Sequence, residues 1–343
     1  MIRAAELGRR EFLRAGLTAA ALAPLTPGLT GVAAAQPKRP RVRFGVGVAL
    51  AYSPCYVARE KHFCEEEGVD VDYFPAPGGS PDVIPAIIGG SADGGVGGSF
   101  GLIAGVEKGA PVITVAIYAY GGERLALAVR TDSGIKTLPD LYGKKVGVQS
   151  GAIGQQMLST MVEVEKLDMS KIDVVPLNNV DMPAAVGAKM VDAIVTWEPY
   201  PSLLEAKGLV RVIQRGGKYL QSPGAVMFGT SFIEKNHDVV FRFVKAHFRA
   251  CQLIRQNPRA AAAIVQKHVK GTTPEVIEQA FQYLVFDPRV TKMIVGEFQA
   301  DMRFMLSQKR ITSPVPARAI TTSTFSDEVE KRHPELVADL VQK

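Results

Sequence analysis

Cysteine is scarce in this sequence, and its distribution argues against two classes of site. The 343 residues contain only Cys55, Cys64 and Cys251. An odd number of cysteines cannot pair completely within one chain, and no Cys-x-x-Cys motif supports a zinc or dithiol redox site. The five histidines are scattered and show no metal-ligand spacing. We therefore expect no metal and no cofactor.

Long apolar runs are also missing. The apolar stretch near the N-terminus is interrupted by Pro24 and Pro27, and no other segment has an uninterrupted apolar run of membrane-spanning length. The hydrophobic fraction of 47% and the charged fraction of 22% are typical of a globular protein. The formal net charge is +6, with basic residues gathered at positions 38–43. Because no basic helix with interleaved aromatic residues follows, we interpret these positions as a solvated tail and expect no nucleic-acid partner.

The N-terminus carries the pattern of an export signal. The pair Arg9-Arg10 is followed by a mild apolar run over residues 15–23 and by the small-residue site Ala33-Ala34-Ala35. This order is typical of a twin-arginine signal peptide over residues 1–35; the alternative is a frayed amphipathic helix with two solvated arginines. We expect export by the twin-arginine translocase, cleavage near Ala35/Gln36 and a periplasmic mature protein.

Short apolar strands alternate with helix-like segments along most of the mature chain. Strand patterns occur at residues 43–48, 69–74, 92–97, 112–118, 125–130, 144–149, 173–177 and 191–195. The alternation predicts an α/β fold of mostly parallel sheets flanked by helices. After Phe232 the pattern is helical to the end.

Five loops at the expected carboxyl ends of strands form the candidate site, because ligands bind at this edge of open α/β sheets. Four of them are built of Gly, Ser or Pro, which lets helix N-terminal N–H groups approach a ligand; the alternative is that these residues serve only turns and caps. None carries Lys or Arg, so we expect N–H groups and helix dipoles, rather than a counter-charge, to hold an anionic group. The candidate ligand-binding residues are Tyr52, Ser53, Pro54, Gly79, Ser80, Ser99, Phe100, Ser150, Gly151, Ala152, Trp197, Glu198 and Tyr200.

The sole tryptophan, Trp197, directly follows a buried strand. With Tyr52 and Phe100 it is expected to wall an organic ligand, and Glu198 is expected to accept a hydrogen bond from a ligand amine or hydroxyl. The alternative is an aromatic residue packed at a strand end beside a solvated glutamate.

Four motifs in order resemble one family. They are YSPCYVARE with FCEEEGV over residues 52–69, GGSADGG at 89–95, RTDSGIKTLPDLYGKKVGV at 130–148 and VDAIVTWEPY at 191–200. The chain resembles the substrate-binding proteins of ABC importers for aliphatic sulfonates, nitrate, taurine and thiamine-pyrimidine precursors.

The resemblance implies a two-lobed periplasmic-binding-protein fold of type II, with a small-molecule ligand trapped between the lobes and the permease subunits as partners. The expected first lobe comprises residues 41–125 and 230–343, and the second comprises residues 126–229. Two hinge crossings are expected near residues 125–130 and 225–230.

The family also contains enzymes, which gives the alternative function. The multi-cysteine motif of the fungal thiamine-pyrimidine synthase is absent, but Cys55 occupies a place similar to the nucleophile of an aryl sulfinate desulfinase. A thiolate at a helix N-terminus would be activated, yet no general base is identifiable, since His62 lies in the following helix. We therefore expect a binding protein and no enzyme. The ligand stays open between sulfonate or nitrate and an aminopyrimidine or aromatic acid.

Overall fold

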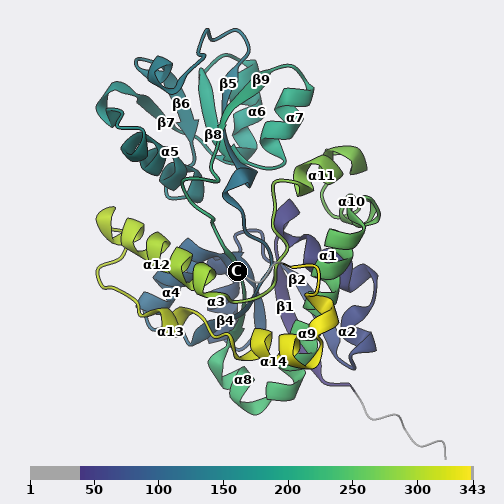
Figure 1. Ribbon diagram of the computed structural model, residues 1–343. Helices are drawn as coiled ribbons and strands as arrows, with labels where there is room; N and C mark the ends of the chain where they lie inside the picture. Colours follow the sequence, from purple (N-terminus) through teal and green to yellow (C-terminus); the bar gives the residue numbers. More distant parts are fainter. Residues whose placement is uncertain (1–38, 341–343) are drawn as a thin grey trace, which may run out of the picture. The chain divides into compact units, whose positions relative to one another are not determined.

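The computed structural model of the chain describes residues 39–340, so the export signal expected at residues 1–35 lies outside the described part. Residues 39–340 form two five-stranded sheets flanked by helices (Figure 1). We call the parts built on these sheets the first lobe and the second lobe. The predicted α/β class and the two lobes are confirmed. No helix within the described residues is long and apolar enough to cross a membrane.

The first sheet has the strand order β2-β1-β3-β10-β4. β1 pairs in parallel with β2 and β3, whereas β10 is antiparallel to both of its neighbours. One strand of the five is therefore reversed, and the sheet is mostly parallel as expected. The strands are β1 (Arg41–Val46), β2 (Asp70–Pro75), β3 (Gly94–Gly98), β4 (Val112–Ile117) and β10 (Gly224–Gly229).

The second sheet repeats this arrangement in the order β7-β6-β8-β5-β9, with β5 as its reversed strand. The two reversed strands are central and almost wholly buried, which explains why their sequences, LALAVR and GAVMFG, contain so little polarity. The strands are β5 (Leu125–Arg130), β6 (Lys145–Val148), β7 (Asp173–Pro176), β8 (Ala193–Trp197) and β9 (Val210–Arg215).

Helices cover the sheets, and the chain after β10 is mainly helical. The long helix α9 (His237–Gln256) turns its apolar face to the first sheet. The ring of Phe243 in this helix lies 4.6 Å from the ring of Phe44 in β1, measured between centroids. The helices of the second lobe are α5 (Ile153–Val164), α6 (Met182–Gly187) and α7 (Tyr200–Ala206). The others are α1 (Ser53–Glu60), α2 (Phe63–Glu66), α3 (Ser80–Ile88), α4 (Ser99–Glu107), α8 (Thr230–Lys235), α9 (His237–Gln256), α10 (Pro258–Val265), α11 (Pro274–Phe281), α12 (Lys292–Ser307), α13 (Ala317–Ile320) and α14 (Thr324–Arg332).

Two short segments connect the lobes, and they lie earlier than expected. The first crossing is residues 118–124, between β4 and β5, and the second is residues 216–223, between β9 and β10. The apolar runs at 125–130 and 225–230, which suggested the crossings, instead belong to the reversed strands inside the sheets. β10 therefore belongs to the first lobe and not to the second. The crossings touch each other, since a Cβ atom at Gly122 would clash with the carbonyl oxygen of Leu220.

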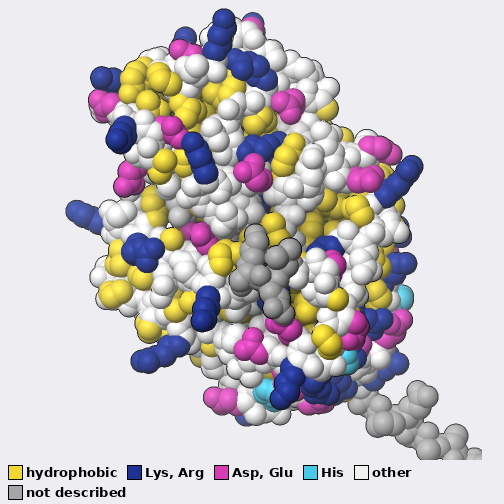
Figure 2. Space-filling view, viewed as in Figure 1, with side chains coloured by type: hydrophobic (Ala, Val, Ile, Leu, Met, Phe, Trp, Pro, Cys, Tyr) yellow, Lys and Arg dark blue, Asp and Glu magenta, His cyan; other side chains and the backbone are white. Residues whose placement is uncertain are grey.

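The surface carries charges of both signs. Figure 2 shows Lys and Arg side chains with Asp and Glu side chains between them on the face in view. Many of these charges are paired, as in the contact of 3.0 Å between Arg249 and Glu67. The basic residues of the described part are thus offset by acidic neighbours.

Candidate functional site

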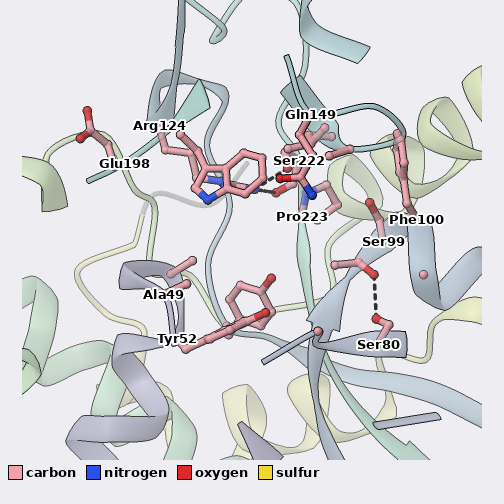
Figure 3. A pocket seen from close by; sticks show the side chains of 18 of the residues that line it. Ala49, Tyr52, Ser80, Ser99, Phe100, Arg124, Gln149, Glu198, Ser222 and Pro223 are labelled. Atoms are coloured by element: carbon pink, nitrogen blue, oxygen red, sulfur yellow. Dashed lines mark hydrogen bonds between the residues drawn. The ribbon is translucent and has the colours of Figure 1, made fainter. Parts of the chain in front are cut away.

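A cavity of about 400 Å³ lies where the ends of strands from both sheets meet the two crossings (Figure 3). Its first-lobe wall is formed by the loops after β1, β2 and β3, and its second-lobe wall by the loops after β6 and β8. The volume falls in the range of small-molecule sites, roughly 300–1,000 Å³. The strand-end loops of both lobes therefore meet around one space.

About half of the predicted site residues lie on the cavity wall. These are Tyr52, Ser80, Ser99, Phe100, Ala152, Trp197 and Glu198. The others do not line it: Ser53, Pro54, Gly79, Ser150, Gly151 and Tyr200. The five predicted loops are thus brought together, but four of them contribute fewer residues than expected; the loop after β3 contributes both Ser99 and Phe100.

Four of the predicted residues that lie off the wall have local structural roles. Ser53 and Pro54 are buried at the start of α1, where the Ser53 hydroxyl donates to the carbonyl of Leu50. Gly79 adopts a positive φ of 65° before α3. Gly151 adopts a φ of 78° and donates its N–H to Gln155 Oε1 at 2.7 Å. Small residues at these positions therefore serve turns and caps, which was the alternative interpretation.

Aromatic side chains form much of the apolar wall. The rings of Tyr52 and Tyr118 meet edge to face with centroids 4.9 Å apart, and Phe100 and Trp197 also line the cavity. Burial raises the pKa of Tyr52 and, more strongly, that of Tyr118. Both phenols therefore keep their protons at neutral pH and can donate hydrogen bonds.

Helix starts supply further polar groups. Ser80 and Ser99 are the first residues of α3 and α4, and Ile153 is the first residue of α5; all three lie on the wall. Unpaired N–H groups at the first turn of a helix favour a negative group. The Ser80 hydroxyl donates to Gly98 O at 2.9 Å, which fixes the start of α3 against the end of β3.

Arg124 is the charged residue on the described wall that the sequence analysis does not predict. It ends the first crossing, one residue before β5, and Nη2 donates to Ser222 Oγ at 2.5 Å in the second crossing (Figure 3). Within residues 39–340, no carboxylate oxygen lies within 4 Å of the Arg124 guanidinium. Burial lowers the pKa of Arg124, but an arginine remains charged at neutral pH.

The five loops carry no Lys or Arg, as the sequence shows, but a cation does line the cavity. The cation comes from a crossing and not from the five loops. A sequence signal was present, because Arg124 stands directly before the buried run 125–130. The expected crossing near residues 125–130 leaves Arg124 outside the candidate site. Tyr118, Gln149, Ser222 and Pro223 also line the cavity and were not predicted.

Glu198 lines the cavity, but its carboxylate is directed elsewhere. Its Oε1 lies 3.0 Å from Arg215 Nη1, and its Oε2 accepts the N–H of Ser202 at 3.3 Å. Figure 3 shows this carboxylate turned away from the space between Tyr52 and Arg124. Burial raises the pKa of Glu198, while Ser202 and Arg215 oppose that effect. The carboxylate thus has partners within the protein, whereas the sequence analysis expects it to accept a hydrogen bond from a ligand.

Cys55 lacks the environment of a nucleophile. Its side chain is buried in the core of the first lobe with Cys64 and Cys251, and it does not line the cavity described above. Burial raises the pKa of the Cys55 thiol far above its ordinary value. Desolvation therefore opposes the activation that the start of a helix would give a thiolate at this position.

The fold and the cavity define a class of protein. Two α/β lobes joined by two crossings, with a small-molecule cavity at the crossings, form the architecture of periplasmic binding proteins. A family model described as NMT1/THI5 like matches residues 50–261. The chain belongs to this family.

Known proteins agree with this assignment. The chain is 24% identical over 294 residues to "Putative aliphatic sulfonates-binding protein" of Bacillus subtilis (strain 168), an alignment that covers 84% of this chain and 88% of the relative. Two solved structures share the fold. The alkanesulfonate-binding protein SsuA from Xanthomonas axonopodis pv. citri, bound to MOPS, has a TM-score of 0.69 at 20% identity and covers 84% of this chain and 100% of its own. A cysteine-to-serine mutant of DSZB in complex with biphenyl-2-sulfinic acid has a TM-score of 0.69 at 16% identity and covers 86% of this chain and 100% of its own.

Proposed function

We propose that this protein is the periplasmic solute-binding component of an ABC importer and that it captures a small organic anion between its lobes. The observation that carries the proposal is Arg124. It is the one Lys or Arg among the described residues of the cavity wall, and its hydrogen-bond partner Ser222 is neutral. The Arg124 guanidinium is half-buried and forms no ion pair with a described carboxylate, so an anion in the cavity would supply the missing partner.

The rest of the wall supports an organic anion. The starts of α3, α4 and α5 add partial positive charge. The cavity is too large for nitrate alone, and its aromatic residues suit the carbon part of a ligand. An organic sulfonate or carboxylate fits this wall best. The relatives named for sulfonate binding point the same way.

Two alternatives fit less well. An aminopyrimidine would need an acceptor such as Glu198, whose carboxylate is held by Arg215 and Ser202. A hydrolase of the sulfinate type would need a reactive cysteine in the cavity, and Cys55 is buried outside it. We therefore assign binding without turnover, delivery to a permease, and export by the N-terminal signal over residues 1–35.

A thermal-shift screen of the mature chain tests the ligand class. Each anion should be paired with a neutral analogue of the same shape, such as benzenesulfonate with benzenesulfonamide, together with nitrate, taurine and an aminopyrimidine. We expect organic anions to stabilise the protein, by about 2.7 kcal/mol at one hundred times Kd. A stronger response to the neutral or cationic compounds would contradict the proposal. An aryl sulfinate turnover assay separates binding from catalysis.

A further inference from the structure

Gln156 and Asp301 make a buried contact between the lobes. Gln156 belongs to α5 of the second lobe and Asp301 to α12 of the first, and the two helices face each other in Figure 1. Gln156 Nε2 donates to Asp301 Oδ1 at 2.9 Å. The residues are 4% and 0% exposed. Neither side chain lines the cavity, so this contact is separate from the ligand wall.

The remaining oxygen of each group has no partner. Gln156 Oε1 and Asp301 Oδ2 are buried and accept no hydrogen bond from any described residue. An ionised carboxylate can only accept hydrogen bonds. With Asp301 ionised, Gln156 Oε1 and Asp301 Oδ2 therefore both stay without a partner. A protonated Asp301 carboxyl has one O–H to donate. The Gln156 amide oxygen is a buried acceptor without a donor, so this O–H can satisfy it.

We propose that Asp301 and Gln156 form a carboxylic acid–amide pair that positions the lobes for ligand capture, and that the pair is complete only when Asp301 carries a proton. The amide N–H donates to one carboxyl oxygen, and the carboxyl O–H donates back to the amide oxygen. Closure takes this proton from water, and opening returns it to water. The inference rests on the proposed function only in treating closure as the step that traps the ligand.

The surroundings of Asp301 favour the protonated form. Burial raises its pKa to about 6, and Glu297 acts in the same direction, while Ser99, Gln156 and Arg124 lower it. The Ser99 hydroxyl makes no hydrogen bond to Oδ2.

Other charged groups on the packed helices are exposed or have partners elsewhere. Glu107 of α4 accepts from Thr312 and Ser313. Arg303 of α12, Arg318 of α13 and Glu163 of α5 are exposed. Glu297 and Arg124 are therefore the charged groups that act on Asp301.

Arg124 couples this pair to the cavity. Its positive charge lowers the pKa of Asp301. An anion bound at Arg124 would offset that charge and so favour the proton on Asp301. Ligand binding and proton uptake should therefore assist each other, as linkage requires.

The sign of the pH effect follows from the two states. In separated lobes the Asp301 carboxyl meets water and regains an ordinary pKa near 3.9. In the contact its pKa is about 6. The extra stability of closure is fully present below about pH 4 and is lost as the pH rises through 6. Binding of an anion should accordingly weaken over this range.

The test measures lobe separation in the full mature chain without ligand. Spin labels at I88C in the first lobe and V180C in the second occupy positions that are 61% and 72% exposed, whereas the native cysteines are buried. Pulsed electron paramagnetic resonance then gives the ratio of closed to open molecules. We expect this ratio to fall at least tenfold between pH 4.5 and pH 8.

Asp301→Asn provides the decisive comparison. An asparagine amide can donate to Gln156 Oε1 and accept from Gln156 Nε2 without any proton uptake. The variant should therefore keep the acidic closed-to-open ratio at pH 8, with no pH dependence between the two values. If Asp301 had a purely structural role, Asp301→Asn would show the same pH dependence of the closed-to-open ratio as the wild type. That result would overturn the proposal.

Two further variants keep the test informative if Asp301→Asn folds poorly. Gln156→Leu should lose the preference for closure at pH 4.5, and Glu297→Gln should keep the pH dependence but shift it to lower pH. A wild-type ratio that does not change with pH would also overturn the proposal. Because no ligand is used, these outcomes are independent of the anion screen that tests the proposed function.

Discussion

The Arg215 guanidinium and the Glu198 carboxylate form a buried ion pair, with Nη1 and Oε1 3.0 Å apart and side chains that are 13% and 1% exposed. Arg215 also donates to the carbonyl oxygen of Glu123 at 2.7 Å and lies 3.4 Å from the ring centroid of Tyr283. Glu198 directly follows Trp197, so the ion pair anchors the loop that presents the indole to the cavity. We therefore regard Glu198 as a residue that positions the ligand wall.

Glu198→Gln tests this role. The substitution keeps the shape of the side chain but leaves Arg215 without its charged partner, so we expect the free energy of unfolding to fall by about 2–4 kcal/mol. Binding of an organic anion should weaken, since the Trp197 loop loses its anchor. Urea unfolding and titration calorimetry measure the two effects. Glu163→Gln, at an exposed position of α5, is the matched control; equal stability of the two variants would contradict the assignment.

Trp197 should report directly on the ligand. Trp197→Ala removes an aromatic face and leaves a void, and we expect a loss of about 1–3 kcal/mol in binding, or tenfold to more than a hundredfold in Kd. Trp197→Phe keeps a ring and should retain more of the affinity. Since the chain has one tryptophan, its fluorescence in the wild type gives an independent titration. Wild-type affinity in Trp197→Ala, with unchanged melting, would place the ligand elsewhere.

The sequence predicted the fold better than it predicted the site. The alternation of strands and helices follows from the local spacing of apolar residues, so the α/β class and the strand-end loops could be inferred from the sequence. Arg124 could not be recognised in the same way, because its role depends on two crossings that meet only in three dimensions. The ion pair of Glu198 could not be predicted for a similar reason: its partner Arg215 lies on a different strand, and nothing local in the sequence indicates the pairing.

Arg124→Met should have opposite effects on the free and the bound protein. It removes a half-buried cation that forms no ion pair with a carboxylate, so the ligand-free protein should become more stable. The same change should cost about 2–5 kcal/mol in binding of an organic anion. Thermal melting with and without the anion measures both effects. Arg303→Met, at an exposed position of α12, should change neither quantity, and an anion response retained in Arg124→Met would show that Arg124 is not the anion partner.

The export signal has a separate test in cells. Changing Arg9 and Arg10 together to Lys keeps the charge but alters the twin-arginine pair, so we expect the precursor to accumulate in the cytoplasm. Fractionation and N-terminal sequencing of the wild type should find a mature form that begins near Gln36. The same mature form in the periplasm at normal levels from the Lys-Lys variant would refute the assignment.

His247 and Asp301 should give stability opposite dependences on pH. Burial lowers the pKa of His247 to about 4, although Nε2 lies 3.0 Å from the carbonyl oxygen of Ile117. Between pH 6.5 and 4 the unfolded chain binds a proton that folded His247 does not, so acidification destabilises the protein by about 3 kcal/mol. Burial raises the pKa of Asp301 to about 6. Between pH 6 and 4 the folded chain with its lobes in contact holds a proton that the unfolded chain releases, so acidification stabilises this closed form by a similar amount.

Because these two effects oppose each other, their sum in the wild type should be nearly flat between pH 4 and 6, and single variants should separate them. His247→Gln keeps a donor for Ile117 O but removes the histidine titration, so its stability should rise on acidification relative to the wild type. Asp301→Asn removes the carboxyl titration, so its stability should fall over the same range. Urea unfolding at pH 4, 5, 6 and 7 measures the slopes, and groups common to all variants cancel in the comparison. The double variant should return to the wild-type slope, because each substitution removes one of two opposing titrations; slopes that do not differ between the single variants would exclude both assignments.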